Sequence, residues 1–387
     1  MSSKLSDKDL LARLVAFDSV SVNSNLPIVD FISDYLERPG VSVIRLANDD
    51  GSKANLLVWA GPTEVDENCR AGLILSGHVD VVPAGDLNEW QSDPFELTER
   101  DGNYFARGSC DMKGFDALAV NLLAEIDPEK LSSPLVLLFS FDEELGTLGA
   151  AHFIKHWPAD KLLPRNAIIG EPTSLKAVRM HKGHLAMSAT VHGQPAHTGS
   201  PHLGKNAIEP AAKIINALAK LRKEFEELRC DTSEYFKEVP GPGLNVTTVM
   251  GGQAINVIPE LCEIGLGLRV LPWMDSEDLV GRIRETVKEA AVGCDFEFEV
   301  LNDSPSFCVS EDADIYKSIC ALVKQNQTIG VTFASDAGHL SLLGIDCVLF
   351  GPGAIEVAHK PNEFIPIDEF NKAKPMLEQL VQQFCVD

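Results

Sequence analysis

The chain has few basic residues and no long apolar run, and each absence excludes a class of protein. Its 387 residues include 33 Lys and Arg against 57 Asp and Glu, a formal net charge of -24. A nucleic-acid-binding surface needs basic patches that neutralise phosphate, so this balance argues against nucleic acid as a partner. No apolar run approaches the roughly 20 residues that span a bilayer, so we also expect no membrane partner.

Closely spaced cysteines and an export signal are missing as well. Nine cysteines lie dispersed between Cys69 and Cys385 without CxxC spacing. Such an odd, scattered set indicates reduced cytosolic thiols, and neither a disulfide framework nor a thiolate zinc site. Residues 1–7 contain neither the basic nor the apolar segment of a signal peptide. We therefore expect a cytoplasmic protein.

Common nucleotide-binding and nucleophile signatures are also absent. The glycines at 251–252 and 265–267 do not form a dinucleotide-binding fingerprint, and the chain has no P-loop. It also has no GxSxG motif, which would place a nucleophilic serine on a strand-to-helix turn. Any catalysis must therefore use other groups.

Apolar runs that alternate with helical stretches predict an α/β fold. The runs are continuous, which is typical of strands buried on both faces of a parallel or mixed sheet. Helices are expected at 6–17, with Ser6 as the cap, and after Gly114. We predict a catalytic domain with a central, mostly parallel or mixed sheet flanked by helices. The four clearest strand runs are 73–75, 135–139, 167–169 and 347–350.

A smaller α+β domain is expected to interrupt this catalytic domain. After Pro172 the pattern changes to half-exposed strands and amphipathic helices, and the α/β pattern returns after Ser310. We predict a discontinuous catalytic domain, 1–178 and 301–387, with an inserted domain at 179–300. The expected elements of the insert are strands at 184–192, 256–271 and 295–300 and helices at 206–228 and 276–291.

Side chains that bind metals follow several of the predicted strands. In open α/β sheets, sites form outside the carboxyl ends of the strands, so residues far apart in sequence can converge there. Imidazole and carboxylate donors suit zinc, cobalt or manganese, and an aspartate with two usable oxygens can bridge two ions. The candidates are His78, Glu143 with Glu144, Glu171 and His359, with Asp111 in a glycine-rich turn before a helix.

Each candidate also has a simpler interpretation. A single histidine after a strand is more often a core or surface residue, Asp111 could cap a helix, and 143–144 could be a solvated turn. The metal hypothesis depends on their joint placement. It also depends on Asp80, two residues after His78, whose carboxylate could hold the second imidazole nitrogen.

Five motifs in order resemble the M20 family of dizinc amidohydrolases and peptidases. The resemblance covers essentially the whole chain, and it includes a dimerisation domain at the position of the predicted insert. It therefore implies an amide hydrolase that forms a homodimer through 179–300. The motifs are 76–83, 107–114, 142–146, 170–173 and 358–364.

The resemblance implies a role for each candidate residue. Asp111 would bridge two divalent ions, most often zinc or cobalt. His78 and Glu171 would complete one site, and Glu144 and His359 the other. In catalysis, Asp80 would orient His78 and Glu143 would act as the general base that takes a proton from the shared water.

Three residues of the insert are implied to bind substrate. His197 matches a histidine that reaches the partner subunit's active site and stabilises the oxyanion. Asn256 and Arg269 match positions that contact the carboxylate end of the substrate, for which a planar guanidinium is well suited. A structural ion pair remains the alternative for Arg269.

The segment 350–364, with 336–338 upstream, looks like the acetylornithine deacetylase branch of the family. That likeness implies removal of acetate from N-acetyl-ornithine in arginine biosynthesis. Succinyl-diaminopimelate desuccinylase is the second hypothesis, and a carboxypeptidase or aminoacylase activity the third. A non-catalytic binding protein with a structural metal site is the alternative class, against which the intact Glu143 argues.

Overall fold

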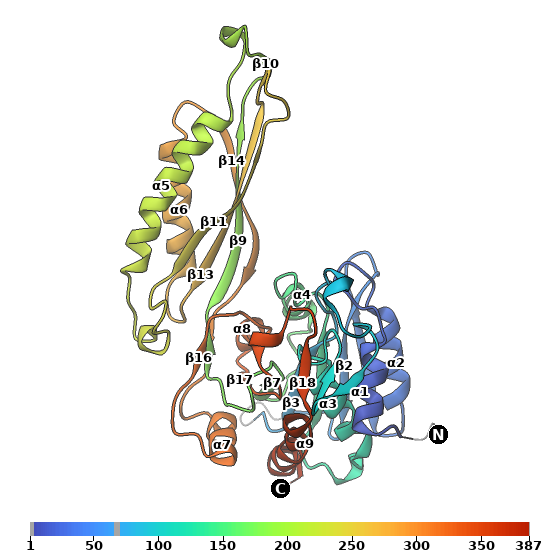
Figure 1. Cartoon of the computed structure of the whole chain (residues 1–387). Coiled ribbons are helices and arrows are strands. Elements are labelled where there is room, and N and C mark those ends of the chain that lie inside the picture. The colour runs from blue at the N-terminus through green and yellow to red at the C-terminus, as the bar shows by residue number, and fades with distance from the viewer. Residues whose placement is uncertain (1–3, 66–69, 387) are drawn as a thin grey trace. The chain divides into compact units, whose positions relative to one another are not determined.

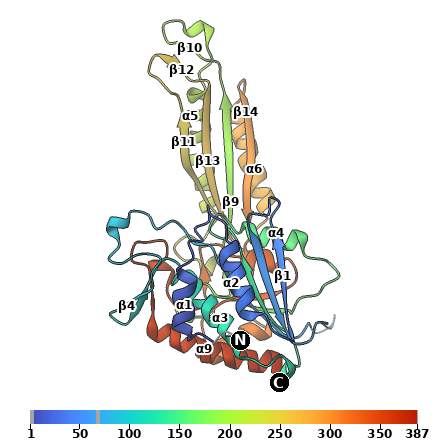
Figure 2. The same ribbon diagram turned by 90° about the vertical axis from the view of Figure 1, so that its right-hand side faces the viewer.

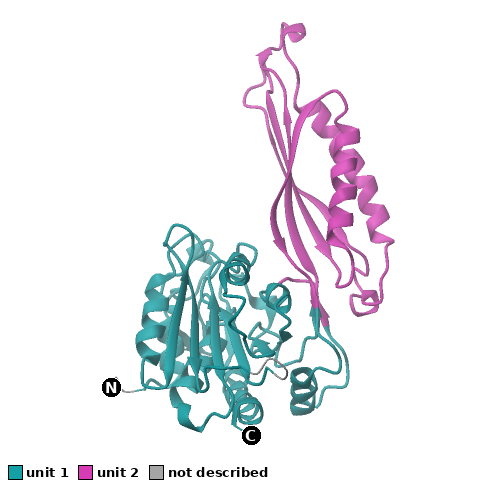
Figure 3. Ribbon diagram, turned by 180° about the vertical axis from the view of Figure 1, so that it is seen from behind, with its two compact units in different colours: residues 1–180, 308–329, 335–387 teal, residues 181–307, 330–334 magenta. Residues whose placement is uncertain are grey.

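The chain forms two compact units in a computed structural model that describes residues 4–65 and 70–386. Unit 1 consists of 1–180, 308–329 and 335–387, and unit 2 consists of 181–307 and 330–334 (Figure 3). No helix in the described part is long and apolar enough to cross a membrane. The eight cysteines described are free thiols, and Cys69 lies outside the described residues.

Unit 1 is built on a six-stranded mixed sheet, so the predicted α/β class is confirmed (Figure 1). Strands β6, β3, β7 and β17 are parallel neighbours, whereas β1 and β2 join the β6 side in antiparallel pairs. The four predicted apolar runs are the parallel strands. In sheet order the strands are β1 (Val41–Ala47), β2 (Ala54–Ala60), β6 (Leu135–Ser140), β3 (Leu73–His78), β7 (Asn166–Ile169) and β17 (Asp346–Leu349).

Helices pack around this sheet, and α3 is buried along nearly its whole length. The predicted cap of α1 is present, since the Ser6 hydroxyl accepts a hydrogen bond from the Asp9 amide. A smaller sheet joins β4 (Thr98–Arg100), β5 (Asn103–Phe105) and β18 (Phe364–Pro366). The helices are α1 (Asp7–Val15), α2 (Leu26–Leu36), α3 (Lys113–Glu125), α4 (Leu148–His156), α7 (Asp314–Val323), α8 (Ala337–Ser341) and α9 (Ile367–Val381).

Unit 2 is a four-stranded antiparallel sheet with two helices on one face (Figure 3). Its core lies between the sheet and these helices, where alternate residues of the strands meet the apolar side of α5. A two-stranded ribbon, β10 (Ala196–His197) with β12 (Val257–Ile258), lies at one end. The main elements are, in sheet order, β11 (Gly243–Gly251), β13 (Leu261–Val270), β9 (Gly183–His192) and β14 (Asp295–Ser304), with α5 (Ile208–Glu226) and α6 (Ser276–Ala290).

The unit boundaries differ slightly from the predicted 178/179 and 300/301. Unit 2 continues to residue 307 because β14 keeps pairing with β9 as far as Ser304 opposite His184. Residues 330–334, predicted in the catalytic domain, also belong to unit 2. There the Lys182 amide donates to the Val331 carbonyl, within a small sheet of β8 (Met180–His181), β15 (Phe307–Cys308) and β16 (Gly330–Val331).

Candidate metal centre

The parallel strands of unit 1 carry the predicted metal ligands to one edge of the sheet. His78 is the last residue of β3, and the turns that follow β6 and β7 hold Glu144 and Glu171. Because these strands are parallel neighbours, their carboxyl ends lie together. Asp111 reaches the same place from the turn before α3, and His359 from the loop between β17 and β18.

These five residues, which we call the histidine–carboxylate cluster, form two groups that share Asp111. His78, Asp111 and Glu171 each offer a ligand atom, and these atoms lie within 4.8 Å of one another. Asp111, Glu144 and His359 do the same. The two histidines approach different oxygens of Asp111, at 3.1 Å for His78 Nε2 and 3.2 Å for His359 Nε2. Asp111 can therefore contact two ions at once.

The two groups differ in their access to solvent. His78, Asp111 and Glu171 are all buried. His359 is exposed, and its Nε2 lies 2.9 Å from Glu144 Oε2. The second group is therefore more accessible to solvent than the first, on the side of His359.

The electrostatics of the cluster fit divalent cations. Burial and the neighbouring Asp111 raise the pKa of Glu171 well above its usual value. Burial opposes charge on His78, yet the hydrogen bond to Asp111 and the surrounding carboxylates outweigh it and raise its pKa. Hydrogen bonds to Asp111 and Glu144 raise the pKa of His359 to about 10. These raised pKa values show that the cluster carries an excess of negative charge, which a cation would balance. Its oxygen and nitrogen donors suit zinc-like ions.

Asp80 holds the cluster in a different way from the one predicted. His78 Nδ1 lies 3.0 Å from the backbone carbonyl of Asp80 and 3.7 Å from its carboxylate. The carboxylate instead accepts from the amides of Glu143 and Glu144, at 3.1 and 3.3 Å, and from the Ser21 hydroxyl at 2.7 Å. Asp80 thus orients the His78 imidazole through its backbone carbonyl, and it orients the turn with Glu143 and Glu144 through its side chain.

Glu143 lies beside the cluster without belonging to either ligand group. Burial, together with the charges of Glu171 and Asp336, raises the pKa of Glu143 well above that of a free glutamate, although nearby His78 opposes the shift. A carboxyl group whose pKa is raised is suited to accept and return a proton. Neighbouring Glu144 instead points to His359.

Glu363 supports the turn that carries Asp111, a role that the sequence did not indicate. It is buried, and its carboxylate accepts from Arg107 Nη1 at 2.6 Å. It also accepts from the amides of Gly108, Cys110 and Asp111, at 2.9–3.0 Å. These bonds fix the turn that presents Asp111. Its position in the motif with His359 is the only signal in the sequence.

A second ion pair, which the sequence did not indicate, holds the turn that carries Glu143 and Glu144, which we call the glutamate turn. Lys53, just before β2, donates to the Asp142 carboxylate at 2.5 and 2.7 Å and to the Ser21 carbonyl at 2.5 Å. Both side chains of this ion pair are largely buried. Asp142 precedes Glu143 directly, so this contact fixes the start of the turn.

In unit 2 the predicted substrate residues do not form one cluster. His197 pairs with Val257, and the Thr198 amide donates to the Asn256 carbonyl at 3.1 Å, so His197 and Asn256 lie together near the β10–β12 ribbon (Figure 2). Arg269 lies near the far end of β13, opposite His184. Eight residues separate Leu261 from Arg269 along this strand, which corresponds to about 26 Å.

The surroundings of Arg269 leave its guanidinium free of ion pairs among the described residues that face it. Burial lowers the pKa of Arg269. Burial and the charge of Arg269 also lower the pKa of the facing His184 to about 4, so that imidazole is neutral at pH 7. A half-buried cation of this kind is suited to bind an anionic group of a ligand.

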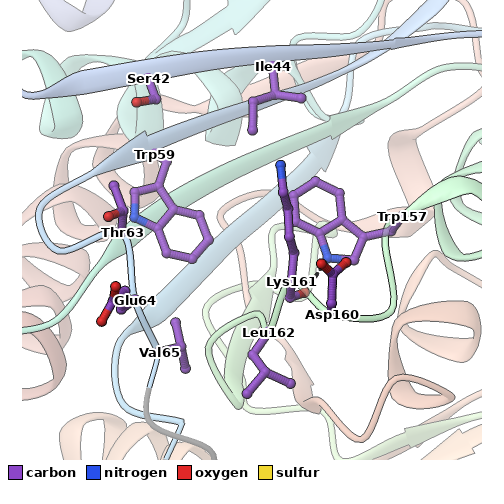
Figure 4. A pocket seen from close by; sticks show the side chains of 10 residues that line it. All are labelled: Ser42, Ile44, Trp59, Thr63, Glu64, Val65, Trp157, Asp160, Lys161 and Leu162. Carbon is purple, nitrogen blue, oxygen red and sulfur yellow. Dashed lines mark hydrogen bonds between the residues drawn. The ribbon is translucent and has the colours of Figure 1, made fainter.

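Unit 1 also has a pocket of about 470 Å³ beside the edge strand β1. Figure 4 shows the indoles of Trp59 and Trp157 on opposite sides of it. Both indole N–H groups donate to nearby backbone carbonyls, of Pro62 and Lys161. None of the predicted site residues lines this pocket.

Comparisons with known proteins identify the family. The model of peptidase family M20/M25/M40 matches residues 74–383. The chain belongs to the M20 family. It is similar to an acetylornithine deacetylase of Pasteurella multocida, with 34% identity over 369 residues that cover 94% of this chain and 92% of the relative. It is therefore a metal-dependent hydrolase that acts on amide bonds.

Solved M20 structures share the fold at low sequence identity. A metallo-carboxypeptidase from Sulfolobus solfataricus matches with a TM-score of 0.76 and 19% identity, over 98% of this chain and 99% of that one. A dinuclear metal-binding peptidase from Bacillus subtilis matches with a TM-score of 0.64 and 14% identity, over 97% and 98%. In the M20 chain described here, the histidine–carboxylate cluster provides the candidate ligands.

Proposed function

We propose that the histidine–carboxylate cluster holds two divalent ions, zinc or cobalt, for the hydrolysis of N-acetyl-ornithine. In this assignment Asp111 would contribute to both sites, His78 and Glu171 would complete one site, and Glu144 and His359 would complete the other. The observation that carries the proposal is the position of Asp111 in both ligand groups, with one histidine at each of its oxygens.

Two ions in such a site would lower the pKa of a shared water and polarise the amide carbonyl. The chain itself supplies the proton chemistry. Glu143, which belongs to neither ligand group, accepts the proton of the attacking water and later delivers it to the departing amine. Its raised pKa suits both steps, because the group must bind a proton and then release it.

The groups around the cluster hold these side chains in position. Asp80 accepts from the amides of Glu143 and Glu144, so the base and a ligand keep a fixed distance from His78. Glu363 does the same for Asp111 through the amides of its turn. Such supporting contacts determine how well a metal site is preorganised.

The substrate assignment depends on the relatives and on the 336–338 and 350–364 segments. The Pasteurella multocida relative is named acetylornithine deacetylase, and so is one from Myxococcus xanthus that is 34% identical over 97% of this chain. Identity over nearly the whole chain supports the same reaction here, in arginine biosynthesis. The unpaired cysteines of the described part support a cytoplasmic location.

We propose that His197, Asn256 and Arg269 contact the substrate, with His197 stabilising the oxyanion and Arg269 binding the carboxylate. About 26 Å of β13 separates Arg269 from the end of unit 2 that holds the other two residues. One small substrate cannot reach both places within a single copy of unit 2. This separation supports a homodimer formed through unit 2, in which each subunit contributes residues to the other's site.

The test is a comparison of N-acyl substrates with purified protein supplied with zinc or cobalt. N-acetyl-ornithine should be hydrolysed with a higher kcat/KM than succinyl-diaminopimelate or dipeptides, measured as release of the free amine. Preference for succinyl-diaminopimelate would overturn the substrate assignment while leaving the site intact. Inactivity on every N-acyl substrate would instead favour a metal-binding protein without catalysis.

A further inference from the structure

A second group of metal-binding side chains lies on the outside of unit 1. His152 and His156 are one turn apart on α4, and Asp49 belongs to the turn between β1 and β2. Each offers a ligand atom, and these atoms lie within 4.8 Å of one another. No residue of this group belongs to the histidine–carboxylate cluster.

The orientation of His156 leaves one of its nitrogens available as a ligand. Its Nδ1 lies 2.9 Å from the backbone carbonyl of His152. Because a carbonyl can only accept a hydrogen bond, Nδ1 carries the proton and Nε2 keeps its lone pair. A backbone carbonyl that fixes the tautomer in this way is a usual partner of metal-binding histidines.

His152 also has the properties of a ligand. Its ring stacks on that of His156 with centroids 4.0 Å apart, and its buried Nδ1 has no hydrogen-bond partner among the described residues. Burial and the neighbouring His156 lower the pKa of His152, although the negative charge of Asp49 opposes this shift. Two imidazoles and one carboxylate thus bring their ligand atoms together.

We propose that Asp49, His152 and His156 form a further metal site that binds a zinc-like transition-metal ion. Histidines at i and i+4 on a helix present their rings on one face, and three protein ligands leave a position for water. Both Asp49 and His156 are exposed, so an ion can enter from solvent. A solvated surface face is the ordinary alternative, but it does not explain the unpartnered imidazole nitrogen.

An ion at this site would connect two elements that support the glutamate turn. The turn with Asp49 leads to Lys53, which binds Asp142. The side-chain amide of Asn55 donates to the backbone carbonyl of Gly149, near the start of α4, at 2.9 Å. The His152 ring also contacts that of Phe141, with centroids 5.7 Å apart. Binding should therefore raise the thermal stability of unit 1 without taking part in the reaction.

The number of ions bound per chain tests the proposal. The full chain is equilibrated with zinc, dialysed at fixed free zinc, and analysed by mass spectrometry, in parallel with His156→Ala and with Lys155→Gln, an exposed neighbour on the same helix. We expect one ion fewer in His156→Ala than in the other two proteins. This difference does not depend on how many ions the histidine–carboxylate cluster holds, so it is separate from the proposed function.

Equal stoichiometry in His156→Ala and the unaltered chain would overturn the proposal. A second variant, Asp49→Asn, removes a proposed ligand and should weaken zinc binding at this site by at least the roughly 10–100-fold that loss of a residue supporting a metal ligand causes. Unchanged affinity in Asp49→Asn would remove the carboxylate from the site and contradict the proposal as stated. Hydrolytic activity of His156→Ala equal to that of the unaltered chain shows that the variant is folded.

Discussion

At the scale of single residues, the site depends on carboxylates that perform different tasks within a few ångströms. Asp111 faces two histidines, Glu144 faces His359, and Glu143 belongs to neither ligand group. Glu363 accepts a hydrogen bond from the backbone amide of Asp111. Three of these four residues are glutamates, so the differences between their contacts come from their surroundings.

Replacement of the proposed base should separate metal binding from catalysis. Glu143→Gln should retain the metal content of the unaltered enzyme because Glu143 is in neither ligand group. Its kcat should fall by about 10²–10⁴-fold, since in the proposed mechanism Glu143 takes the proton of the water. Steady-state kinetics and metal analysis of the same sample check both statements. Loss of metal would show that base and ligand had been misassigned.

The buried Glu363 should be far more sensitive than a surface glutamate. Glu363→Gln removes the charge that pairs with Arg107 and turns an acceptor toward the amides of the Asp111 turn into a donor. We expect a loss of about 3–5 kcal/mol in the free energy of unfolding, measured by urea denaturation. Glu99→Gln, at an exposed ion pair with Lys8, should change little. Similar effects of the two substitutions would contradict the role given to Glu363.

Local sequence pattern indicated the candidate ligands more readily than the residues that support them, for a physical reason. Four of the five candidates follow shortly after an apolar run or lie in a glycine-rich turn, and His359 lies in the last of the five family-like motifs. The contacts of Glu363 with Arg107 and of Lys53 with Asp142 join residues 256 and 89 positions apart. Nothing local marks such pairs. For the same reason, the sequence could not show that His78 uses the backbone of Asp80 and not its carboxylate.

At the scale of elements, a close contact joins β3, the strand that carries His78, to α3, the helix that follows Asp111. A Cβ atom added to Gly77 would lie 2.1 Å from Asp116 Oδ1 and 3.0 Å from Met112 Cε. Gly77 immediately precedes His78, the last residue of β3. Only a residue without a side chain lets the helix that follows Asp111 pack this close to the strand that carries His78.

Two glycine substitutions should therefore have opposite effects. Gly77→Ala should destabilise the fold by about 1–3 kcal/mol, the usual effect of overpacking a core. Gly281→Ala, in α6 with no atom within 4 Å of the added carbon, should stabilise by about 0.4–1 kcal/mol. Thermal unfolding of the two variants measures both. Destabilisation of the same size in both would show that the β3–α3 contact is not the cause.

Hydrophobic periodicity predicted α5 and β9, whose buried residues recur at the spacing of a helix and a strand. Continuous apolar runs predicted the four parallel strands, which are buried on both faces. Strand β11 was not predicted, because most of its residues are exposed and show no alternation. The position of 330–334 in unit 2 was also missed, since it depends on contacts such as the hydrogen bond from the Lys182 amide, just after β8, to the Val331 carbonyl in β16, 149 positions away.

At the scale of the whole molecule, the proposed homodimer makes a prediction about mixed subunits. If His197 acts on the partner subunit's site, then His197→Ala and Glu143→Gln are each inactive alone but complement each other when mixed. Random exchange in a symmetric dimer would restore about a quarter of the sites. The measurement is amide hydrolysis after the two variants have been unfolded and refolded together. No recovery, in a sample shown to contain mixed dimers, would place His197 in its own subunit's site.

The central claim is that His78, Asp111, Glu144, Glu171 and His359 together bind two ions. Anomalous diffraction from crystals grown with zinc locates the ions directly. The claim predicts two peaks in the histidine–carboxylate cluster, one on each side of the Asp111 carboxylate, with ligand atoms at about 2.0–2.2 Å. Crystals that show zinc elsewhere on the chain and no peak beside Asp111 would contradict it.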